Sequence, residues 1–155
     1  MLFVRDVTGA LGMLLKQLDE AVAANKAVDL RSFAVVLTDD REATEAKLKE
    51  LAQKYAISDN VPLVIPEDLA PLKRYKIHQD AEVTVLLYRR CIVLDNFAFK
   101  AGELKEQDVK AIMAALPKII PSQEDLEREA KEKAEAELKR KLEAEKQKAA
   151  KKENE

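Results

Sequence analysis

The only cysteine of this chain is the first candidate for chemistry, because a thiolate is a strong nucleophile and metal ligand. Cys91 lies in the stretch LLYRRCIVL, residues 86–94, and no other cysteine occurs among the 155 residues. A lone cysteine excludes a disulfide within the chain and zinc sites built from several cysteines. We expect Cys91 to be a small apolar residue or an inert surface thiol. Because Arg89 and Arg90 precede it and positive charge favours a thiolate, a reactive thiol or a disulfide between two copies is the alternative.

Three further groups of residues are candidates for catalysis or ligand binding. His78 is the only histidine, and without a partner cysteine we interpret it as a polar loop residue instead of a general base. Asp39 and Asp40 follow an apolar run, where a helix N-cap explains them better than a metal pair does. Gly9 and Gly12 flank a predicted helix start, which could hold an anion, although close packing explains two glycines more simply. We predict no metal and no cofactor.

Composition limits the class of protein. The chain is 47% hydrophobic with a formal net charge of −2, which suits one domain of about 100–150 residues with an appendage. The near-neutral charge gives no electrostatic reason to expect a nucleic-acid partner. No run approaches the roughly 18 apolar residues of a membrane span. Arg5 and Asp6 interrupt the first apolar run too early for a signal peptide, so we expect a cytoplasmic protein, or an exported one if an upstream signal segment is missing.

The composition changes near Pro121. Of the 29 acidic and 27 basic residues, 11 and 10 lie in residues 122–155, which leaves 18 and 17 for residues 1–121. Ser122 is a suitable N-cap for a helix with acidic residues in its first turn. Apolar residues then recur every four positions, so their stripe drifts around the helix instead of forming a coiled-coil seam. We expect residues 1–120 to form the globular domain, and residues 121–155 a charged helical tail, exposed or partly disordered. A partner-binding helix is the alternative for the tail.

Residues 1–120 alternate between strand and helix patterns. Apolar runs predict buried strands, and the 3.6-residue spacing of leucines and alanines predicts helices. Two closing strands are so close in sequence that they must form an antiparallel hairpin joined through Arg89 and Arg90. Strands separated by helices should be parallel through right-handed crossovers. The predicted strands are 2–4, 32–40, 60–66, 82–88 and 92–99, and the predicted helices are 8–25, 41–55, a single turn within 68–77, and 104–119.

This order resembles the thioredoxin fold, and its closest branch looks like the peroxiredoxin and TlpA-type proteins. Three segments carry the resemblance: FVRDVTGALGMLLKQLDEA, FAVVLTDDREATEAKLKELAQKYAI with the following VPLVIPED, and RYKIHQDAEVTVLLYRRCIVLDNFAF. It covers residues 2–116 and none of the tail. The resemblance implies a three-layer α/β sandwich, with a five-stranded mixed sheet in the order 3-2-1-4-5 and helices on both faces. It also suggests a poorly characterised bacterial subgroup.

The redox centre of that family is degenerate here. Its chemistry needs a thiolate at the start of the first long helix, where free N–H groups and the helix dipole stabilise negative charge. The family's cis-proline before the hairpin aligns with Val83, and a non-proline cis bond costs about 3–4 kcal/mol, so we predict a trans peptide there. A threonine hydroxyl cannot exchange with a disulfide. The residues aligned with the family's redox motif are Thr8, Gly9, Ala10 and Leu11.

We therefore predict a redox-inactive thioredoxin-fold module that serves binding or structure, with no catalytic residue. Its partner would be another protein, held in the groove near Thr8 and Val83 or by the helix of residues 122–155. One alternative is a thiol–disulfide oxidoreductase or peroxiredoxin-like protein that uses Cys91 or a cysteine outside this chain. Another is a glutathione- or anion-binding domain at the start of the first helix, between Thr8 and Gly12.

Overall fold

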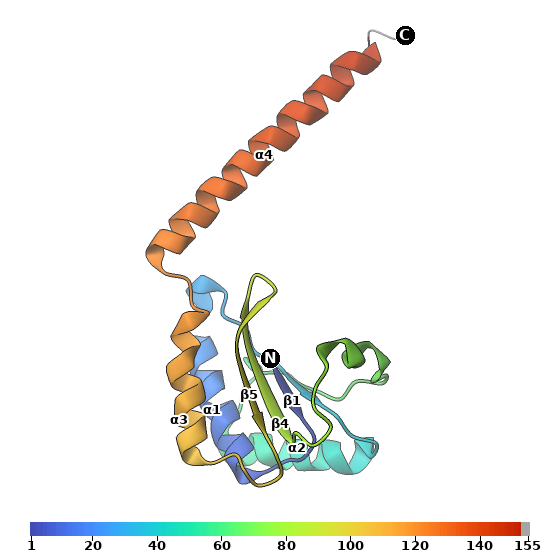
Figure 1. Cartoon of the computed structure of the whole chain (residues 1–155), viewed down its shortest axis with the longest axis vertical. Helices are drawn as coiled ribbons and strands as arrows, with labels where there is room; N and C mark the ends of the chain where they lie inside the picture. Colours follow the sequence, from blue (N-terminus) through green and yellow to red (C-terminus); the bar gives the residue numbers. More distant parts are fainter. Residues whose placement is uncertain (153–155) are drawn as a thin grey trace. The chain divides into compact units, whose positions relative to one another are not determined.

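The computed structural model describes the backbone of residues 1–152 and the side chains of residues 1–143. The chain divides into two compact units, Met1–Ile120 and Pro121–Glu155. The elements of the first unit alternate strands and helices (Figure 1). In chain order they are β1 (Leu2–Val4), α1 (Gly9–Ala24), η1 (Lys26–Val28), β2 (Ala34–Val36), α2 (Arg41–Tyr55), β3 (Leu63–Val64), η2 (Ala70–Tyr75), β4 (Val83–Arg89), β5 (Ile92–Phe99), α3 (Glu106–Ala115) and η3 (Leu116–Lys118), where η marks a 3-10 helix.

The five strands form one mixed sheet in the order β3-β2-β1-β4-β5, which confirms the predicted order. β1 and β3 both run parallel to β2. β4 is antiparallel to β1 and to β5. Val4 at the end of β1 lies opposite Val36 on one side and Val83 on the other, and Val83 in turn lies opposite Phe99. The carboxyl end of β1, the start of β4 and the end of β5 therefore meet at one end of the sheet.

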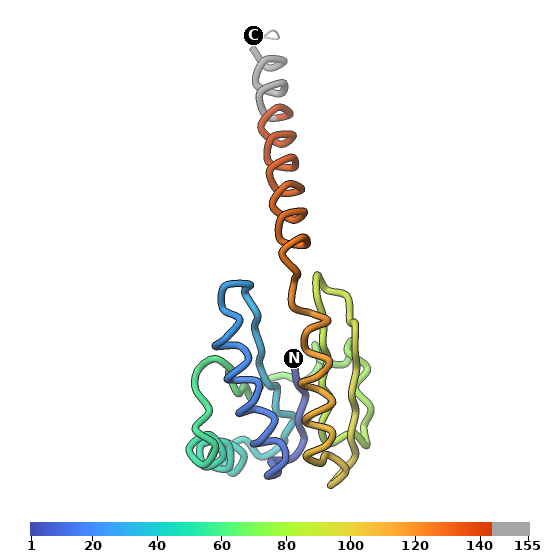
Figure 2. The backbone as a smooth tube through the Cα atoms, turned by 90° about the vertical axis from the view of Figure 1, so that its left-hand side faces the viewer, coloured from blue at the N-terminus to red at the C-terminus, as the bar shows by residue number. Residues whose placement is uncertain are grey.

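All three α-helices of this unit pack against the same face of the sheet. Figure 2 shows α1 and α3 side by side in front of the strands. Because β1, β2 and β3 step across the sheet in one direction, two right-handed crossovers place α1 and α2 on the same face. The main core joins alternate residues of the strands to the apolar stripes of these helices: Leu2, Val4, Ala34, Val36, Val83, Val85 and Leu87 from the sheet, and Leu11, Leu14, Leu15, Leu18, Leu48, Leu51, Val109 and Ile112 from the helices.

The opposite face is covered by η2 instead of an α-helix. Phe3, Val35 and Leu86 point to this side and form a second, smaller core. Leu72 and Ile77 pack against it, and the ring of Tyr75 lies 5.1 Å from that of Phe3, centroid to centroid. Helices were expected on both faces of the sheet. On this face the helix is the 3-10 helix η2. The helical turn predicted within residues 68–77 is this η2, and Met1, Phe33 and Leu37 also pack against the second core.

Side-chain caps explain where the helices begin. The Thr8 hydroxyl accepts a hydrogen bond from the Leu11 N–H at 3.4 Å, and α1 starts directly after it. The Asp40 carboxylate accepts the Ala43 N–H at 3.1 Å at the start of α2, as the sequence predicted for this residue. These caps satisfy amide groups that have no partner within the helix.

Several elements are shorter than their sequence patterns predicted. β2 spans only three of the predicted residues 32–40, and β3 only two of residues 60–66. Pro62 and Pro66 flank β3, and proline has no N–H to donate to a strand ladder. The predicted helix 104–119 is α3 followed by the 3-10 helix η3, and the change falls directly before Pro117. Proline lacks the N–H that an α-helix interior requires.

The second unit contains α4 (Gln123–Lys152). Ser122 caps it as predicted: its hydroxyl accepts the Asp125 N–H at 3.1 Å, and the Asp125 carboxylate accepts the Ser122 N–H at 3.1 Å. Leu138 and Leu142 are exposed, and Glu137 pairs with Lys141 at 2.7 Å. Among the helices that the structure describes, none combines the length and the hydropathy that a membrane span requires.

Candidate functional site

The residues aligned with the redox motif form the first turn of α1. The Thr8 hydroxyl is the N-cap, so the position that the resemblance aligns with a thiol of that family holds a capping group. Leu11, the other position aligned with a thiol, is buried in the main core at 1% exposure. Gly9 and Ala10 complete the turn. The residues of this turn therefore serve helix initiation and core packing.

Val83 lies at the same end of the sheet as the start of α1, as the resemblance predicted. The backbone N–H of Arg5 donates to the Glu82 carbonyl at 2.8 Å, and the Arg5 guanidinium donates to the Ala81 carbonyl at 3.1 Å. These bonds tie the loop that leads into α1 to the loop that leads into β4. The peptide bond before Val83 is trans, as predicted. Since the Val83 side chain has no exposed surface, contact with a partner at the predicted groove would rest on Thr8 and its neighbours in α1. Binding in that groove stays a prediction.

Close packing explains Gly12. A Cβ atom at Gly12 would lie 2.3 Å from Cε2 of Tyr55, so the ring of this α2 residue lies against the bare helix backbone. At Gly9 a Cβ atom would lie 3.4 Å from the Tyr55 hydroxyl oxygen. Tyr55 thus covers one side of the first turn of α1. Both glycines lie beside this ring, in agreement with the sequence-based interpretation that they allow close packing. Anion or glutathione binding at this helix start stays a prediction.

His78 and Asp39 do not take part in a cluster of possible ligands. His78 is exposed, and its Nδ1 accepts the Asp80 N–H at 3.2 Å within the same loop. Within residues whose placement is described, no three His, Cys, Asp or Glu side chains come together in a way that could hold a metal ion. The other acidic residue of the TDD stretch, Asp40, is the α2 cap. His78 is thus the polar loop residue that the sequence indicated.

Cys91 lies at the opposite end of β4 from Val83. Arg90 and Cys91 form a two-residue turn between the paired residues Arg89 and Ile92, one position further along than the predicted joint at Arg89 and Arg90. The seven residues of β4 separate this turn from the start of α1 by roughly 20 Å at about 3.4 Å per residue. The thiol is exposed. The position of Cys91 therefore separates it from the helix start where the thioredoxin-like family places its thiolate.

The turn holds two non-glycine residues in the left-handed backbone region, with φ of 50° at Arg90 and 63° at Cys91. Such a conformation costs an L-residue with a Cβ atom about 1–2 kcal/mol, and glycine avoids the cost. We expect Cys91→Gly to raise the free energy of unfolding by about 1 kcal/mol, whereas Cys91→Ser leaves it within about 0.5 kcal/mol. Urea denaturation followed by circular dichroism measures both.

Gly102 provides the matched control for this prediction. It has a φ of 72° with nothing within 4 Å of an added Cβ atom, so Gly102→Ala changes only the backbone cost. We expect this variant to be about 1 kcal/mol less stable than the parent chain. A destabilised Cys91→Gly variant would show that the thiol makes packing contacts worth more than the strain of the turn.

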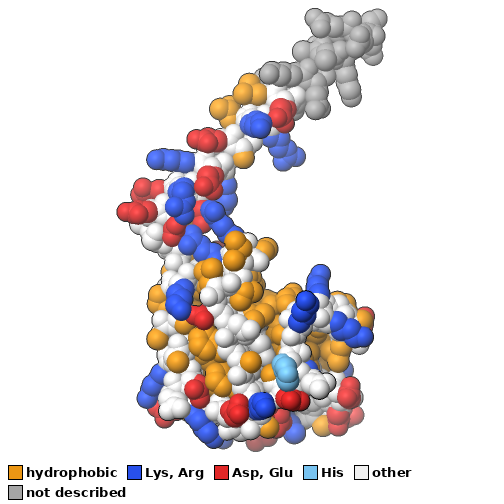
Figure 3. Space-filling model, viewed as in Figure 1, with side chains coloured by type: hydrophobic (Ala, Val, Ile, Leu, Met, Phe, Trp, Pro, Cys, Tyr) orange, Lys and Arg blue, Asp and Glu red, His pale blue; other side chains and the backbone are white. Residues whose placement is uncertain are grey.

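Apolar side chains are exposed at the tip of the β4–β5 hairpin, a feature that sequence reasoning missed. Tyr88, Ile92, Val93 and Leu94, which we name the hairpin patch, have exposed fractions of 39, 64, 51 and 47%. Figure 3 shows hydrophobic side chains gathered over this hairpin. The signal in the sequence was three consecutive apolar residues in a strand of a half-exposed sheet, where alternation is the rule.

A shift in strand pairing places the hairpin patch on both sides of the sheet. Tyr88 lies opposite Val93, and Arg89 lies opposite Ile92, but Leu87 lies opposite Asp95. Leu94 is therefore the extra residue of a β-bulge. Since directly opposite residues share a face and neighbours alternate, Val93 and Ile92 project to opposite faces. The patch is thus an apolar strand edge with side chains on both faces.

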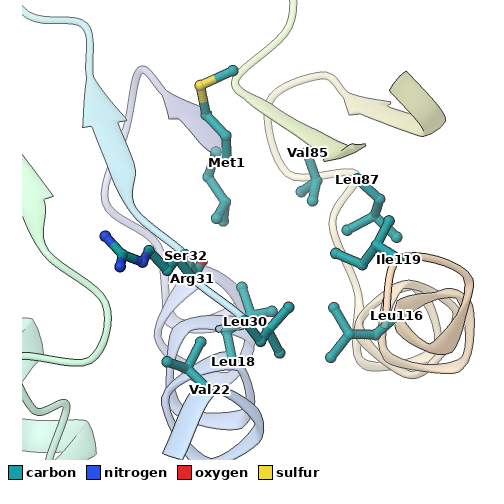
Figure 4. A pocket seen from close by; sticks show the side chains of 11 residues that line it. Met1, Leu18, Val22, Leu30, Arg31, Ser32, Val85, Leu87, Leu116 and Ile119 are labelled. Atoms are coloured by element: carbon teal, nitrogen blue, oxygen red, sulfur yellow. The ribbon is translucent and has the colours of Figure 1, made fainter. Parts of the chain in front are cut away.

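Two hollows lie elsewhere in the first unit. One, shown in Figure 4, is surrounded by side chains from α1, β1, β4 and η3, and its volume of about 20 Å³ admits little more than one water molecule. The N-terminal amine of Met1 donates to the Leu86 carbonyl at 3.1 Å beside it, and burial lowers the pKa of this amine to about 6. The other is an open groove of about 370 Å³ between α2 and β3. Its charged groups are paired: Arg41 donates to the Ile65 carbonyl, and Lys49 pairs with Glu45, whose pKa it lowers.

No protein-family model, curated protein or solved structure matches this chain.

Proposed function

We propose that this chain is a non-catalytic protein-binding module on a thioredoxin-like fold, and that the hairpin patch is its binding surface. The observation that carries the proposal is the exposure of four large apolar side chains within seven consecutive residues of one hairpin. Contiguous exposed apolar surface on a soluble domain typically marks a site of protein interaction. Aromatic and aliphatic residues at such a site supply the buried centre of an interface.

The fold assignment within this proposal has its support in topology. The sheet order and the position of Val83 beside the start of α1 are those that the resemblance implies. The absence of catalysis has its support in chemistry. The first turn of α1 offers a hydroxyl that is engaged as a cap, and the sole thiol lies at the far end of β4. A protein-binding role needs neither group.

Photo-crosslinking from a defined position tests the binding surface. A photoreactive phenylalanine at Val93 is expected to capture a second protein molecule, either another copy of this chain or a different protein, in the cell that makes this chain. The same group at Val64, a 43% exposed residue on the other edge of the sheet, is the matched control and is expected to capture little. Equal capture from both positions, or none from Val93, would refute the hairpin patch as the binding surface.

Redox assays test the other half of the proposal. We expect insulin reduction and peroxide consumption to stay at background for the parent chain and for Cys91→Ser. Turnover that disappears in Cys91→Ser would establish the thiol-dependent alternative instead.

A further inference from the structure

We propose that β5 is the interface of a homodimer, in which the β5 strands of two copies pair antiparallel around a two-fold axis. The two sheets would then continue into one. The inference rests on the proposed function, because it names the partner of the hairpin patch as a second copy of this chain.

The backbone of β5 offers an unusually long free edge. β5 has eight residues and pairs with β4 on one side only. The bulge at Leu94 interrupts the ladder, and after it the outer N–H and C=O groups of residues 95–99 point away from the sheet regularly over about 17 Å. The strand contains no proline and no lysine, the residues that commonly protect sheet edges from further pairing. The opposite edge differs: β3 has two residues and is flanked by Pro62 and Pro66. Only β5 is suited to accept another strand.

The side chains of β5 match those of a second β5. A strand that covers this edge must bring apolar groups to both faces, since Val93 and Ile92 project to opposite faces and both are more than half exposed. β5 itself meets this requirement: its residues are Ile92, Val93, Leu94, Asp95, Asn96, Phe97, Ala98 and Phe99. A symmetric pair therefore places apolar residues of one copy beside apolar residues of the other.

Charge also favours a second copy over a foreign partner. Asp95 is the only charged residue of β5, and it pairs with Lys118 of its own chain at 2.5 Å. The strand thus presents no charge that would select an oppositely charged partner. Residues 1–121 carry 18 acidic and 17 basic residues, so two copies of this unit experience little long-range repulsion. The two Asp95 side chains should not lie directly opposite each other, because like charges across a strand pair are destabilising.

The size of the contact predicts a reversible dimer. Stable protein interfaces bury about 1,600 Å² in total, and a contact made only by two strand edges and the hairpin patches is smaller. We therefore expect monomer and dimer to exchange, with the dimer populated at high concentration. Such an equilibrium is measurable by sedimentation velocity on the full chain.

The test compares Val93→Lys with Val64→Lys. A lysine on a strand edge opposes pairing without disturbing the sheet itself, and both sites are exposed valines on edge strands. We expect Val93→Lys to raise the dimer dissociation constant at least about tenfold, a loss of about 1.4 kcal/mol, and Val64→Lys to leave it unchanged. Circular dichroism confirms that each variant is folded.

Hydrogen exchange then locates the interface. Amides of β5 should gain protection as the concentration of the full chain rises, while amides of β3 should not. A chain that stays monomeric at all concentrations would overturn the inference, and so would a dimer that Val93→Lys leaves unchanged. Either result leaves the crosslinking of other proteins from Val93 as a separate test of the proposed function.

Discussion

Replacing Phe3 by alanine is expected to lower the free energy of unfolding by about 3–5 kcal/mol, the range for removing a large aromatic side chain from a core. Phe3 is 1% exposed and heads the fully buried side chains in size. It is the centre of the second core, between the sheet and η2. Urea denaturation followed by circular dichroism measures the loss.

Tyr75→Ala is the control for this variant. The Tyr75 ring packs on Phe3 but remains 38% exposed, so its removal should cost about 1 kcal/mol. In the double variant the two losses should not add, because the interaction between the rings is removed by either change. A loss below about 1 kcal/mol for Phe3→Ala alone would show that η2 does not hold a packed layer on this face.

Replacing Asp19 by alanine is expected to lower the free energy of unfolding by about 2–4 kcal/mol. The effect is large for an aspartate in a helix, because such residues usually face solvent. Asp19 lies on α1 at 6% exposure and accepts the Ser58 N–H at 3.1 Å and the Ser58 hydroxyl at 2.6 Å. Ser58 in turn accepts the side-chain amide of Asn60 at 2.6 Å. Hydrogen bonds to a charged acceptor contribute about 1.5–3 kcal/mol, and the Asp19 carboxylate accepts two of them. Asp19 therefore anchors the loop that leads from α2 into β3.

The neighbouring acid provides the control. Glu20 is exposed and pairs with Lys16 at 3.4 Å across one helical turn, so Glu20→Ala should change stability by less than about 0.5 kcal/mol. Ser58→Ala alone should cause most of the loss of stability that Asp19→Ala causes. The two changes should couple in a double-mutant cycle. Equal effects of Asp19→Ala and Glu20→Ala, measured by urea denaturation, would contradict the anchoring role.

The parts of the fold that the sequence predicted correctly depend on short-range patterns. The leucine spacing of residues 11–22 identified the buried face of α1, and five apolar runs identified the strands, whose order was also correct. Caps were equally readable at Asp40 and Ser122, because a cap and the amide it satisfies are three residues apart. Short strands that follow one another with a helix between them leave few allowed topologies.

The candidate sites were only partly predictable. The sequence showed that the start of α1 has no thiol and that Cys91 belongs to a hairpin. It did not show that Tyr55 covers Gly12, that Asp19 reaches Ser58, or that Ile92, Val93 and Leu94 lie exposed. An apolar run in a sequence suggests a buried strand. Whether it is buried depends on whether another layer lies over that part of the sheet.

The sequence by itself determined the elements, their order and the chemistry that this chain can mount at the first turn of α1. The tertiary structure alone decided which residues are covered. It placed the three α-helices of the first unit on one face and η2 on the other, and it left the β5 edge open. The reason is physical: propensity, capping and periodicity act within a few residues, whereas burial is set by contacts between segments far apart in the chain.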